Sequence, residues 1–281
     1  MTAAPLLRTR TALARAVARW RARGLTVGLV PTMGALHEGH AALIRRAARD
    51  NDRALVSLFV NPLQFGPNED YGRYPRALPA DRRLATAAGA HAVYAPSPEE
   101  MYPKGFRTHV EVEELSTLYC GHYRPGHFRG VATVVLKLFN QIRPDRAYFG
   151  EKDFQQAAIL TRMAADLDVP VRVVRVPTVR AKDGLALSSR NAYLSVDQRT
   201  AAPALRAALL AGAASARRRG AAPRSVTTSV QLALARTGLK LQYACVADAA
   251  TLEPARDLNG PRRLLAAAYL GRTRLIDNIP L

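Results

Sequence analysis

Two imidazoles, His37 and His40, lie three residues apart in a glycine-bearing stretch of the sequence. A short apolar run, Val27–Val30, precedes this stretch, and apolar residues at helix spacing follow it over Ala41–Asp50. A strand, a turn and a helix in this order present backbone N–H groups and the positive end of a helix to an anion, which suits phosphate. Residues three apart on a helical turn lie on one side, so both rings can reach the same phosphate group.

The same two histidines allow two other interpretations. A His-x-x-His pair also occurs as ordinary surface or structural histidines. A metal site would need a third ligand, and usually the i, i+4 spacing of the metalloprotease helix. The strand before the pair, the glycines within the stretch and the helix after it favour phosphate.

Three further polar clusters follow predicted strands. They are Asn61 with Gln64, Gly150-Glu151-Lys152-Asp153 with Gln156, and Leu187-Ser188-Ser189-Arg190. Each cluster alone could be a surface turn, a helix N-cap region or a loop whose side chains bond to its own backbone. Together they supply amides, a lysine, hydroxyls and an arginine, which are the groups needed to handle a triphosphate and a polar organic acid.

The elements that must position these clusters alternate between strands and helices. Strands are predicted at 27–30, 54–60, 91–95, 145–149 and 171–179, and helices at 10–23, 41–50, 80–89, 131–142 and 154–168. Nearly continuous apolar runs are typical of parallel strands buried on both faces, and their alternation with helices favours an α/β fold with a Rossmann-like, doubly wound parallel sheet. Ligands collect at the carboxyl ends of such strands, where the polar clusters lie.

The pattern changes beyond about Asn191. Helices are predicted at 197–219 and 223–237, and strands at 239–246, 262–270 and 273–276. Two helices followed by consecutive strands indicate a small α+β domain. We therefore predict a Rossmann-like nucleotide domain over residues 1–180 and a smaller α+β lid domain over residues 181–281.

Composition excludes some classes of function. The chain has 281 residues, 48% of them apolar, and no apolar run approaches the ~18 residues of a spanning helix, so we expect a soluble protein without a membrane partner. The formal charge of +19 comes mainly from arginines spread over the whole chain rather than from one patch. We therefore expect no nucleic-acid partner, although the positive field would favour small anionic substrates.

Two cysteines, Cys120 and Cys245, cannot make a disulfide framework, and a reducing cytoplasm fits them. The first 36 residues contain no acid and many arginines, as transit peptides do. The amphipathic pattern over Arg10–Arg23 favours a folded first helix instead, so we expect a cytoplasmic protein.

At this point the sequence resembles a known family. His37-Glu38-Gly39-His40 is similar to the HIGH signature of the nucleotidyltransferase superfamily, and the string from Pro31 to His40 is similar to the pantothenate synthetase (pantoate–β-alanine ligase) family. The resemblance covers nearly the whole chain. It continues through the stretches 59–65, 74–76, 124–131, 148–156, 181–191 and 274–278.

The resemblance implies ATP-dependent condensation of pantoate with β-alanine, which gives pantothenate, AMP and pyrophosphate through a pantoyl-adenylate. It implies that His37 and His40 contact the phosphates, with His40 as proton donor, and that Lys152 assists catalysis. The implied ATP-binding residues are Met33, Gly34, Ala35, Leu36, His37, Glu38, Gly39, His40, Gly150, Glu151, Lys152, Asp153, Val179, Leu187, Ser188, Ser189 and Arg190. Gln64, Gln156 and Asn61 are implied for pantoate and β-alanine. Magnesium is expected on the phosphates, held through water or by Asp81, and a homodimer is expected by analogy.

Two rivals remain at this stage. Another HIGH-type nucleotidyltransferase would retain the nucleotide in its product, and a basic RNA-binding relative of tRNA synthetases would show a salt-steep affinity for RNA. One departure from the family is visible, because Cys120 stands where relatives usually carry Glu, ahead of Arg-Pro-Gly-His-Phe. This change puts the contacts of the loop around Cys120 in doubt.

Overall fold

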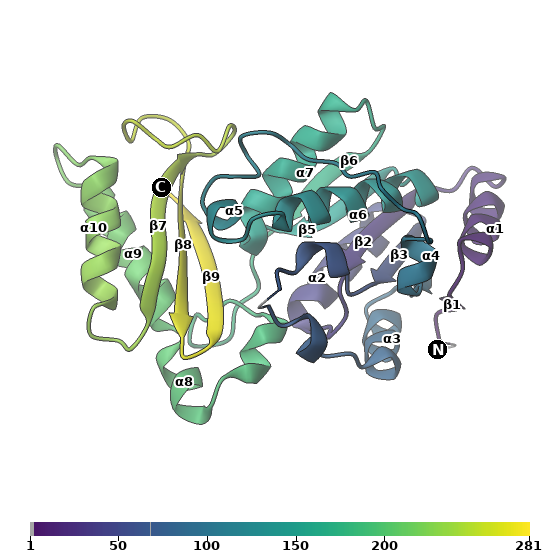
Figure 1. The fold of residues 1–281 in the computed structure, drawn as a ribbon, viewed down its shortest axis with the longest axis horizontal. Helices are drawn as coiled ribbons and strands as arrows, with labels where there is room; N and C mark the ends of the chain where they lie inside the picture. The colour runs from purple at the N-terminus through teal and green to yellow at the C-terminus, as the bar shows by residue number, and fades with distance from the viewer. Residues whose placement is uncertain (1–2, 68) are drawn as a thin grey trace. The chain divides into compact units, whose positions relative to one another are not determined.

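A six-stranded parallel sheet forms the first part of the fold (Figure 1). Its strands are β1 (Leu6–Leu7), β2 (Val27–Thr32), β3 (Arg53–Leu58), β4 (Ala92–Tyr94), β5 (Arg146–Gly150) and β6 (Arg172–Val176). They lie in the order β1-β4-β3-β2-β5-β6, and every pair is parallel. The apolar runs of the sequence account for these strands, because Ala54 to Leu58 of β3 are all buried. The structure is a computed structural model and describes residues 3–67 and 69–281.

Helices cover both faces of this sheet. They are α1 (Arg10–Arg21), α2 (Glu38–Asp50), α3 (Leu78–Ala87), α6 (His127–Ile142) and α7 (Phe154–Asp166), with two short helices, α4 (Pro98–Met101) and α5 (Cys120–Tyr123). Helix α2 packs on β2, β3 and β5, while α6 packs on β2 and against α1. Figure 1 shows α2 and α3 on one side of the sheet and α6 and α7 on the other.

The strand order places a topological switch point between β2 and β5. From β2 the chain continues through α2 to β3 on one side, and from β5 it continues through α7 to β6 on the other. Ligands of open α/β sheets bind outside the carboxyl ends of the strands at such a point. Met33 follows β2 directly and Glu151 follows β5 directly, so two of the predicted clusters begin at the switch point.

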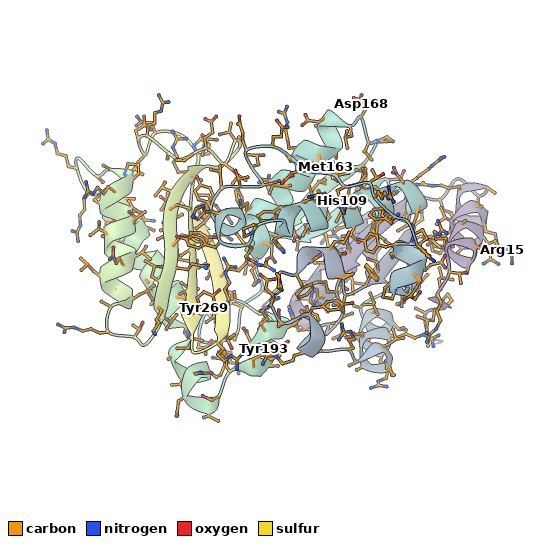
Figure 2. The ribbon with its side chains drawn as sticks, viewed as in Figure 1. Arg15, His109, Met163, Asp168, Tyr193 and Tyr269 are labelled. Atoms are coloured by element: carbon orange, nitrogen blue, oxygen red, sulfur yellow. The ribbon has the colours of Figure 1, made fainter. Side chains whose placement is uncertain are left out.

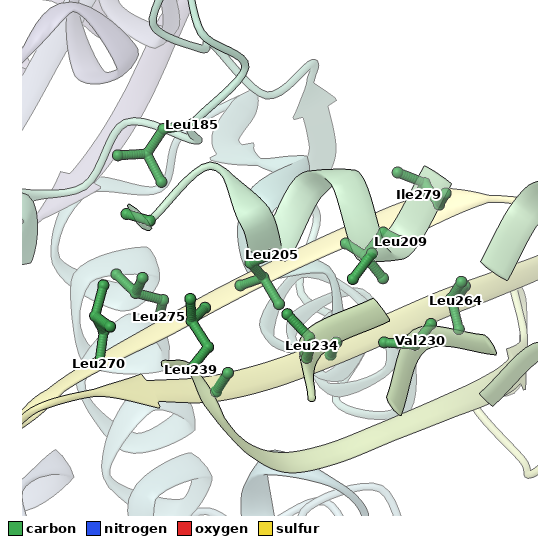
Figure 3. Close-up of a cluster of buried hydrophobic side chains, with 14 of the residues drawn as sticks. Leu185, Leu205, Leu209, Val230, Leu234, Leu239, Leu264, Leu270, Leu275 and Ile279 are labelled. Carbon is green, nitrogen blue, oxygen red and sulfur yellow. The ribbon is translucent and has the colours of Figure 1, made fainter. Parts of the chain in front are cut away.

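The second part of the fold is a three-stranded antiparallel sheet with its own helices. The strands are β7 (Lys240–Asp248), β8 (Arg262–Leu270) and β9 (Thr273–Pro280), in the order β7-β8-β9, and the helices are α8 (Val196–Ala201), α9 (Ala204–Ala216) and α10 (Pro223–Leu234). Leucines and valines of α9, α10 and the sheet form a separate buried core (Figure 3). The single helix predicted over 197–219 is two helices, because Pro203 lacks an N–H for helix bonding and α9 starts anew after it.

The chain divides into two compact units. Unit 1 comprises Met1–Glu151 and Ile159–Pro177, and unit 2 comprises Lys152–Ala158 and Thr178–Leu281. The predicted α/β class with a Rossmann-like parallel sheet and a smaller α+β part is confirmed. The predicted domain limits of 1–180 and 181–281 differ from the two units chiefly at Lys152–Ala158, which groups with unit 2. Within the described residues, no helix combines the length and apolarity needed to cross a membrane.

Candidate functional site

A carboxylate from α3 holds the shape of the turn that follows β2. Asp81 accepts hydrogen bonds from the backbone N–H groups of Ala35 (3.0 Å) and Leu36 (2.7 Å), and it is only 5% exposed. Gly34 and Ala35 both have positive φ, +84° and +50°. A Cβ on Gly34 would lie 2.9 Å from the Asp81 carboxylate, and an alanine in the left-handed region costs about 1–2 kcal/mol. The carboxylate therefore keeps a strained turn in place at the carboxyl end of β2.

His37 and His40 cap the first turn of α2. Nδ1 of His37 accepts from the backbone N–H of Gly39 (3.1 Å), and Nδ1 of His40 accepts from the backbone N–H of His37 (3.3 Å). Their ring centroids lie 4.1 Å apart. Because each Nδ1 is an acceptor, each neutral ring carries its proton on Nε2, where it can donate to a ligand. Glu38 instead pairs with Arg45 at the surface of α2.

Asn61 is the centre of a buried hydrogen-bond network after β3. Its side chain is 1% exposed; Oδ1 accepts from Tyr102 Oη (2.7 Å) and from the N–H of Leu63 (3.3 Å). Its Nδ2 donates to Gln64 Oε1 (3.0 Å) and to the carbonyl of Gly130 in α6 (3.0 Å). These contacts engage both ends of the Asn61 amide in shaping the loop.

Gln64 ends the 3-10 turn η1 (Pro62–Gln64) and is held from two sides. Its Nε2 lies 3.1 Å from Sδ of Met33. Met33 is the first residue of the turn Met33–His40, which we call the histidine turn. Its carbonyl lies 2.8 Å from Nδ1 of His127 in α6, and Nε2 of His127 lies 2.9 Å from Nη1 of Arg124. Because a guanidinium only donates, His127 accepts at Nε2 and donates from Nδ1 to Gln64.

Arg124 connects this support to the loop beyond Gln64. It makes a two-bond ion pair with Glu69, with both N–O distances 2.6 Å, and its side chain is 13% exposed. Burial opposes its charge, but the Glu69 carboxylate and the neighbouring Cys120 thiol hold the pKa of Arg124 above its usual value. The sequence indicated His127 and Arg124 only as part of a motif, and it did not predict their support of Gln64.

In unit 2, Lys152 lies in the 3-10 turn η3 (Glu151–Asp153), between β5 and α7. Its side chain is 18% exposed, and Nζ lies 3.5 Å from the Asp153 carboxylate. Its backbone carbonyl accepts a hydrogen bond from Nδ2 of Asn278 on β9 (2.9 Å). Gln156 follows in the first turn of α7 and is half-buried. The contact from Asn278 was not predicted, because it joins residues 126 positions apart.

The serine–arginine cluster of unit 2 follows a short hairpin. The backbone N–H of Leu187 donates to the carbonyl of Val179 (3.0 Å), and Arg180 and Ala186 form an antiparallel bridge. Arg180 also makes two bonds to the buried Asp277 of β9, at 2.7 and 2.9 Å. These contacts fix the segment that leads directly into Ser188.

Ser188 caps the 3-10 turn η4 (Ser189–Tyr193), since its Oγ accepts from the backbone N–H of Arg190 (3.3 Å). This turn packs against β9. Tyr193, at the end of the turn, is labelled in Figure 2. The hydroxyl of Ser188 therefore caps the turn that carries Ser189 and Arg190.

The predicted site residues therefore divide between the units. Unit 1 holds Met33, Gly34, Ala35, Leu36, His37, Glu38, Gly39, His40, Asn61, Gln64, Asp81, Gly150 and Glu151, and unit 2 holds Lys152, Asp153, Gln156, Val179, Leu187, Ser188, Ser189 and Arg190. Within unit 1 the histidine turn and Gln64 come together through Met33. Among the residues that the structure describes, no three His, Cys, Asp or Glu side chains are grouped to hold a metal ion.

Comparisons with known proteins agree over the full length of the chain. The family model described as pantoate-beta-alanine ligase matches residues 5–280. A pantothenate synthetase of Moorella thermoacetica is 51% identical over 279 residues, with 98% of each chain covered. That of Paramagnetospirillum magneticum is 52% identical over 279 residues, with 99% of this chain and 98% of the relative covered.

Solved structures give the same result. A pantothenate synthetase of Thermus thermophilus aligns with a TM-score of 0.92 at 48% identity, with 98% of both chains covered. A pantoate-beta-alanine ligase of Francisella tularensis, solved with "Beta-gamma ATP" and β-alanine, aligns with a TM-score of 0.82 at 33% identity, with 99% of this chain and 97% of that chain covered. The fold, the turn with its two histidines and these matches lead to one conclusion: the chain belongs to the pantoate–β-alanine ligase family.

Proposed function

We propose that the chain catalyses the ATP-dependent condensation of pantoate with β-alanine to pantothenate, with AMP and pyrophosphate as the other products. The observation that carries this proposal is the match of a single ligase family to residues 5–280. The Francisella tularensis ligase was solved with an ATP compound and β-alanine, which are the nucleotide and the amine of this reaction. The histidine turn at the switch point of the sheet supports a nucleotide substrate independently.

The first step activates the pantoate carboxylate. A carboxylate is a poor acylating agent, so one of its oxygens attacks the α-phosphorus of ATP and the bond to pyrophosphate breaks. Negative charge builds on the phosphate oxygens in this transition state, and fixed donors stabilise it. The Nε2–H groups of His37 and His40 are two such donors, since capping contacts occupy both Nδ1 atoms. We assign to His40 the donation of a proton to the leaving pyrophosphate.

Unit 2 supplies the residues that we assign to the β- and γ-phosphates. Lys152 contributes a cation, Ser188 and Ser189 hydroxyls, and Arg190 a second cation. The proposed surroundings of the nucleotide are completed by ten further residues: Met33, Gly34, Ala35, Leu36, Gly39, Gly150, Glu151, Asp153, Val179 and Leu187. The hydroxyl oxygen of Ser188 already accepts the capping bond of η4. In this proposal the same hydroxyl also donates its proton to a phosphate oxygen.

Neutral amides suit the pantoate side, because a second carboxylate would repel the acid. We assign Gln64 and Gln156 to the hydroxyl and carboxylate oxygens of pantoate. For Asn61 the contacts favour a supporting role, since its amide holds Gln64 and the carbonyl of Gly130. In the second step the neutral amine of β-alanine attacks the acyl carbon, AMP leaves with the electron pair of the broken bond, and the new amide nitrogen loses a proton.

Magnesium enters this proposal as part of the MgATP substrate. Each oxygen of Asp81 already accepts a backbone N–H group, and the side chain is almost fully buried. Magnesium prefers open octahedral positions filled by phosphates, water and one or two carboxylates, so these contacts fit a residue that shapes the turn better than a metal ligand. We retain a homodimer and a cytoplasmic location as proposals from the family.

The proposed function is tested by a two-step assay. Enzyme with ATP and pantoate should release pyrophosphate before β-alanine is added, and free AMP should appear only after the addition. The variant His40→Ala should lose pantoate-dependent pyrophosphate release while it keeps its fold. The matched control is His122→Ala, because His122 is exposed on α5 and should leave the reaction unchanged. A product that retains the nucleotide, or full activity of His40→Ala, would contradict the proposal.

A further inference from the structure

The turn that carries Lys152 is attached to a distant strand through its backbone. Nδ2 of Asn278, on β9, donates to the carbonyl oxygen of Lys152 at 2.9 Å. Asn278 is 3% exposed, so this bond forms away from water, where loss of one partner is costly. The contact lies entirely within unit 2, because Lys152–Ala158 belongs to that unit.

The orientation of the Asn278 amide is fixed by its two neighbours. Its Oδ1 accepts from Nε of Arg263 at 2.6 Å, and arginine can only donate. Its Nδ2 faces a carbonyl, which can only accept. A flipped amide would set donor against donor and acceptor against acceptor, so only one orientation satisfies both bonds. Arg263 is itself 9% exposed, and its guanidinium lies over the ring of Phe154, 4.5 Å from the ring centroid. Phe154 directly follows η3, so Arg263 contacts this segment as well as Asn278.

Strand register explains how β9 serves two segments at once. Asn278 pairs with Leu265, which places it on the same face of the sheet as Arg263. Its neighbour Asp277 faces the opposite side, where it holds Arg180 with two bonds. Arg180 begins the hairpin that leads to Ser188. Adjacent residues of one strand therefore hold both segments of unit 2 that we assign to the phosphates.

We propose that Asn278 is a positioning residue for the activation of pantoate: it sets the place of Lys152 from β9. The inference depends on the proposed phosphate role of Lys152. Because the amide bonds to the backbone of the lysine, it fixes where the side chain starts and does not engage Nζ, which lies 3.5 Å from the Asp153 carboxylate. The C-terminal strand thus contributes to the chemistry without contacting a substrate.

The sharpest test is Asn278→Asp. This change keeps the size of the side chain and an acceptor for Arg263, but it replaces the donor toward Lys152 with an oxygen that repels the carbonyl. A misplacement of about 1 Å can cost about 100-fold in rate, so kcat for pyrophosphate release should fall by about that factor. KM for pantoate should stay unchanged. The matched control is Asn259→Asp in an exposed loop of the same unit, which should leave kcat unchanged.

A double-mutant cycle separates positioning from general damage. If Asn278 acts through Lys152, Asn278→Asp should lower the rate of wild-type enzyme but not the residual rate of Lys152→Ala. Equal losses in both backgrounds would overturn the inference. Full activity of Lys152→Ala would instead overturn the proposed role of the lysine. Circular dichroism checks the fold, and Asn278→Ser, which lacks the reach to Lys152, repeats the cycle if Asn278→Asp does not fold.

Discussion

The histidine turn of unit 1 and the lysine turn of unit 2 are supported in different ways. The histidine turn has local support, because His37 and His40 bond to backbone groups within three residues, and it is also contacted by Asp81 and Gln64, 31 or more positions away in other described segments. The lysine turn is held by Asn278, 126 positions later in the sequence. One turn is therefore shaped in part by its own sequence, while the other depends on completion of the C-terminal sheet.

This difference has a consequence for how damage spreads. A change in β9 should disturb the lysine turn and the serine–arginine segment together, because Asp277 and Asn278 are neighbours on one strand. A change near the histidine turn should remain local, because its caps lie within α2. Substitutions in the two units should therefore differ both in the size and in the reach of their effects.

Asp277→Ala should give the largest loss of stability. Removing the buried carboxylate leaves the half-buried Arg180 without its ion-pair partner and beside Arg206, whose pKa is lowered by burial and then by repulsion from Arg180. Breaking a buried ion pair in this way costs about 3–5 kcal/mol. The free energy of unfolding in urea measures it.

The control for that prediction is Asp257→Ala, because Asp257 is 55% exposed and its partner Arg262 keeps a second carboxylate, that of Asp248. Exposed pairs contribute about 0–1 kcal/mol, so this variant should unfold almost as the wild type does. Similar losses of unfolding free energy for the two variants would show that the ion pair of Asp277 does not stabilise unit 2 more than the pair of Asp257 does.

Asp81→Ala should have an intermediate and local effect. The N–H groups of Ala35 and Leu36 lose their acceptor, which costs about 1–3 kcal/mol for buried groups. Hydrogen exchange should speed up at these two amides while the amides of unit 2 keep their rates. Asp81→Asn retains one acceptor and should lie between the wild type and Asp81→Ala. Faster exchange throughout both units would contradict a local role.

Ala35→Gly should have the smallest effect, and in the stabilising direction. Glycine adopts the positive φ of residue 35 without strain, which recovers about 1 kcal/mol or less after the greater entropy of glycine in the unfolded chain is subtracted. Ala14→Gly, at an exposed position inside α1, should destabilise by about 1 kcal/mol instead. Thermal unfolding of the two variants should therefore shift in opposite directions, and a shift in the same direction would argue against strain at residue 35.

The main strands of the fold could be predicted from the sequence because the patterns that indicate them, apolar runs, are local in the chain. Apolar runs predict β2, β3 and β5, and the observed strands differ from those predictions by only a few residues at their ends. The break in the helix at Pro203 was missed, because the alanine-rich flanks on both sides favour helix so strongly. A proline between two helical stretches was the available signal.

The site was only partly predictable for the same reason. The capping of α2 by His37 lies within the motif itself, so its spacing indicates the geometry. The bonds from His127 to Gln64 and from Asn278 to Lys152 join residues far apart in sequence, and side-chain types alone do not specify such pairs. Asp81 was predicted only as a magnesium ligand, and its bonds to the backbone of the turn were not indicated by its charge or its position in the sequence.

Gly130 limits how the loop that carries Gln64 can be redesigned. A Cβ at this position would lie 2.2 Å from the carbonyl oxygen of Leu63 and 2.6 Å from the backbone nitrogen of Gln64. Helix α6 therefore touches the Gln64 loop through bare backbone, so no larger residue fits at position 130 unless the helix or the loop moves. Attempts to broaden the range of accepted acids should vary the side chain at position 64 and leave the glycine untouched.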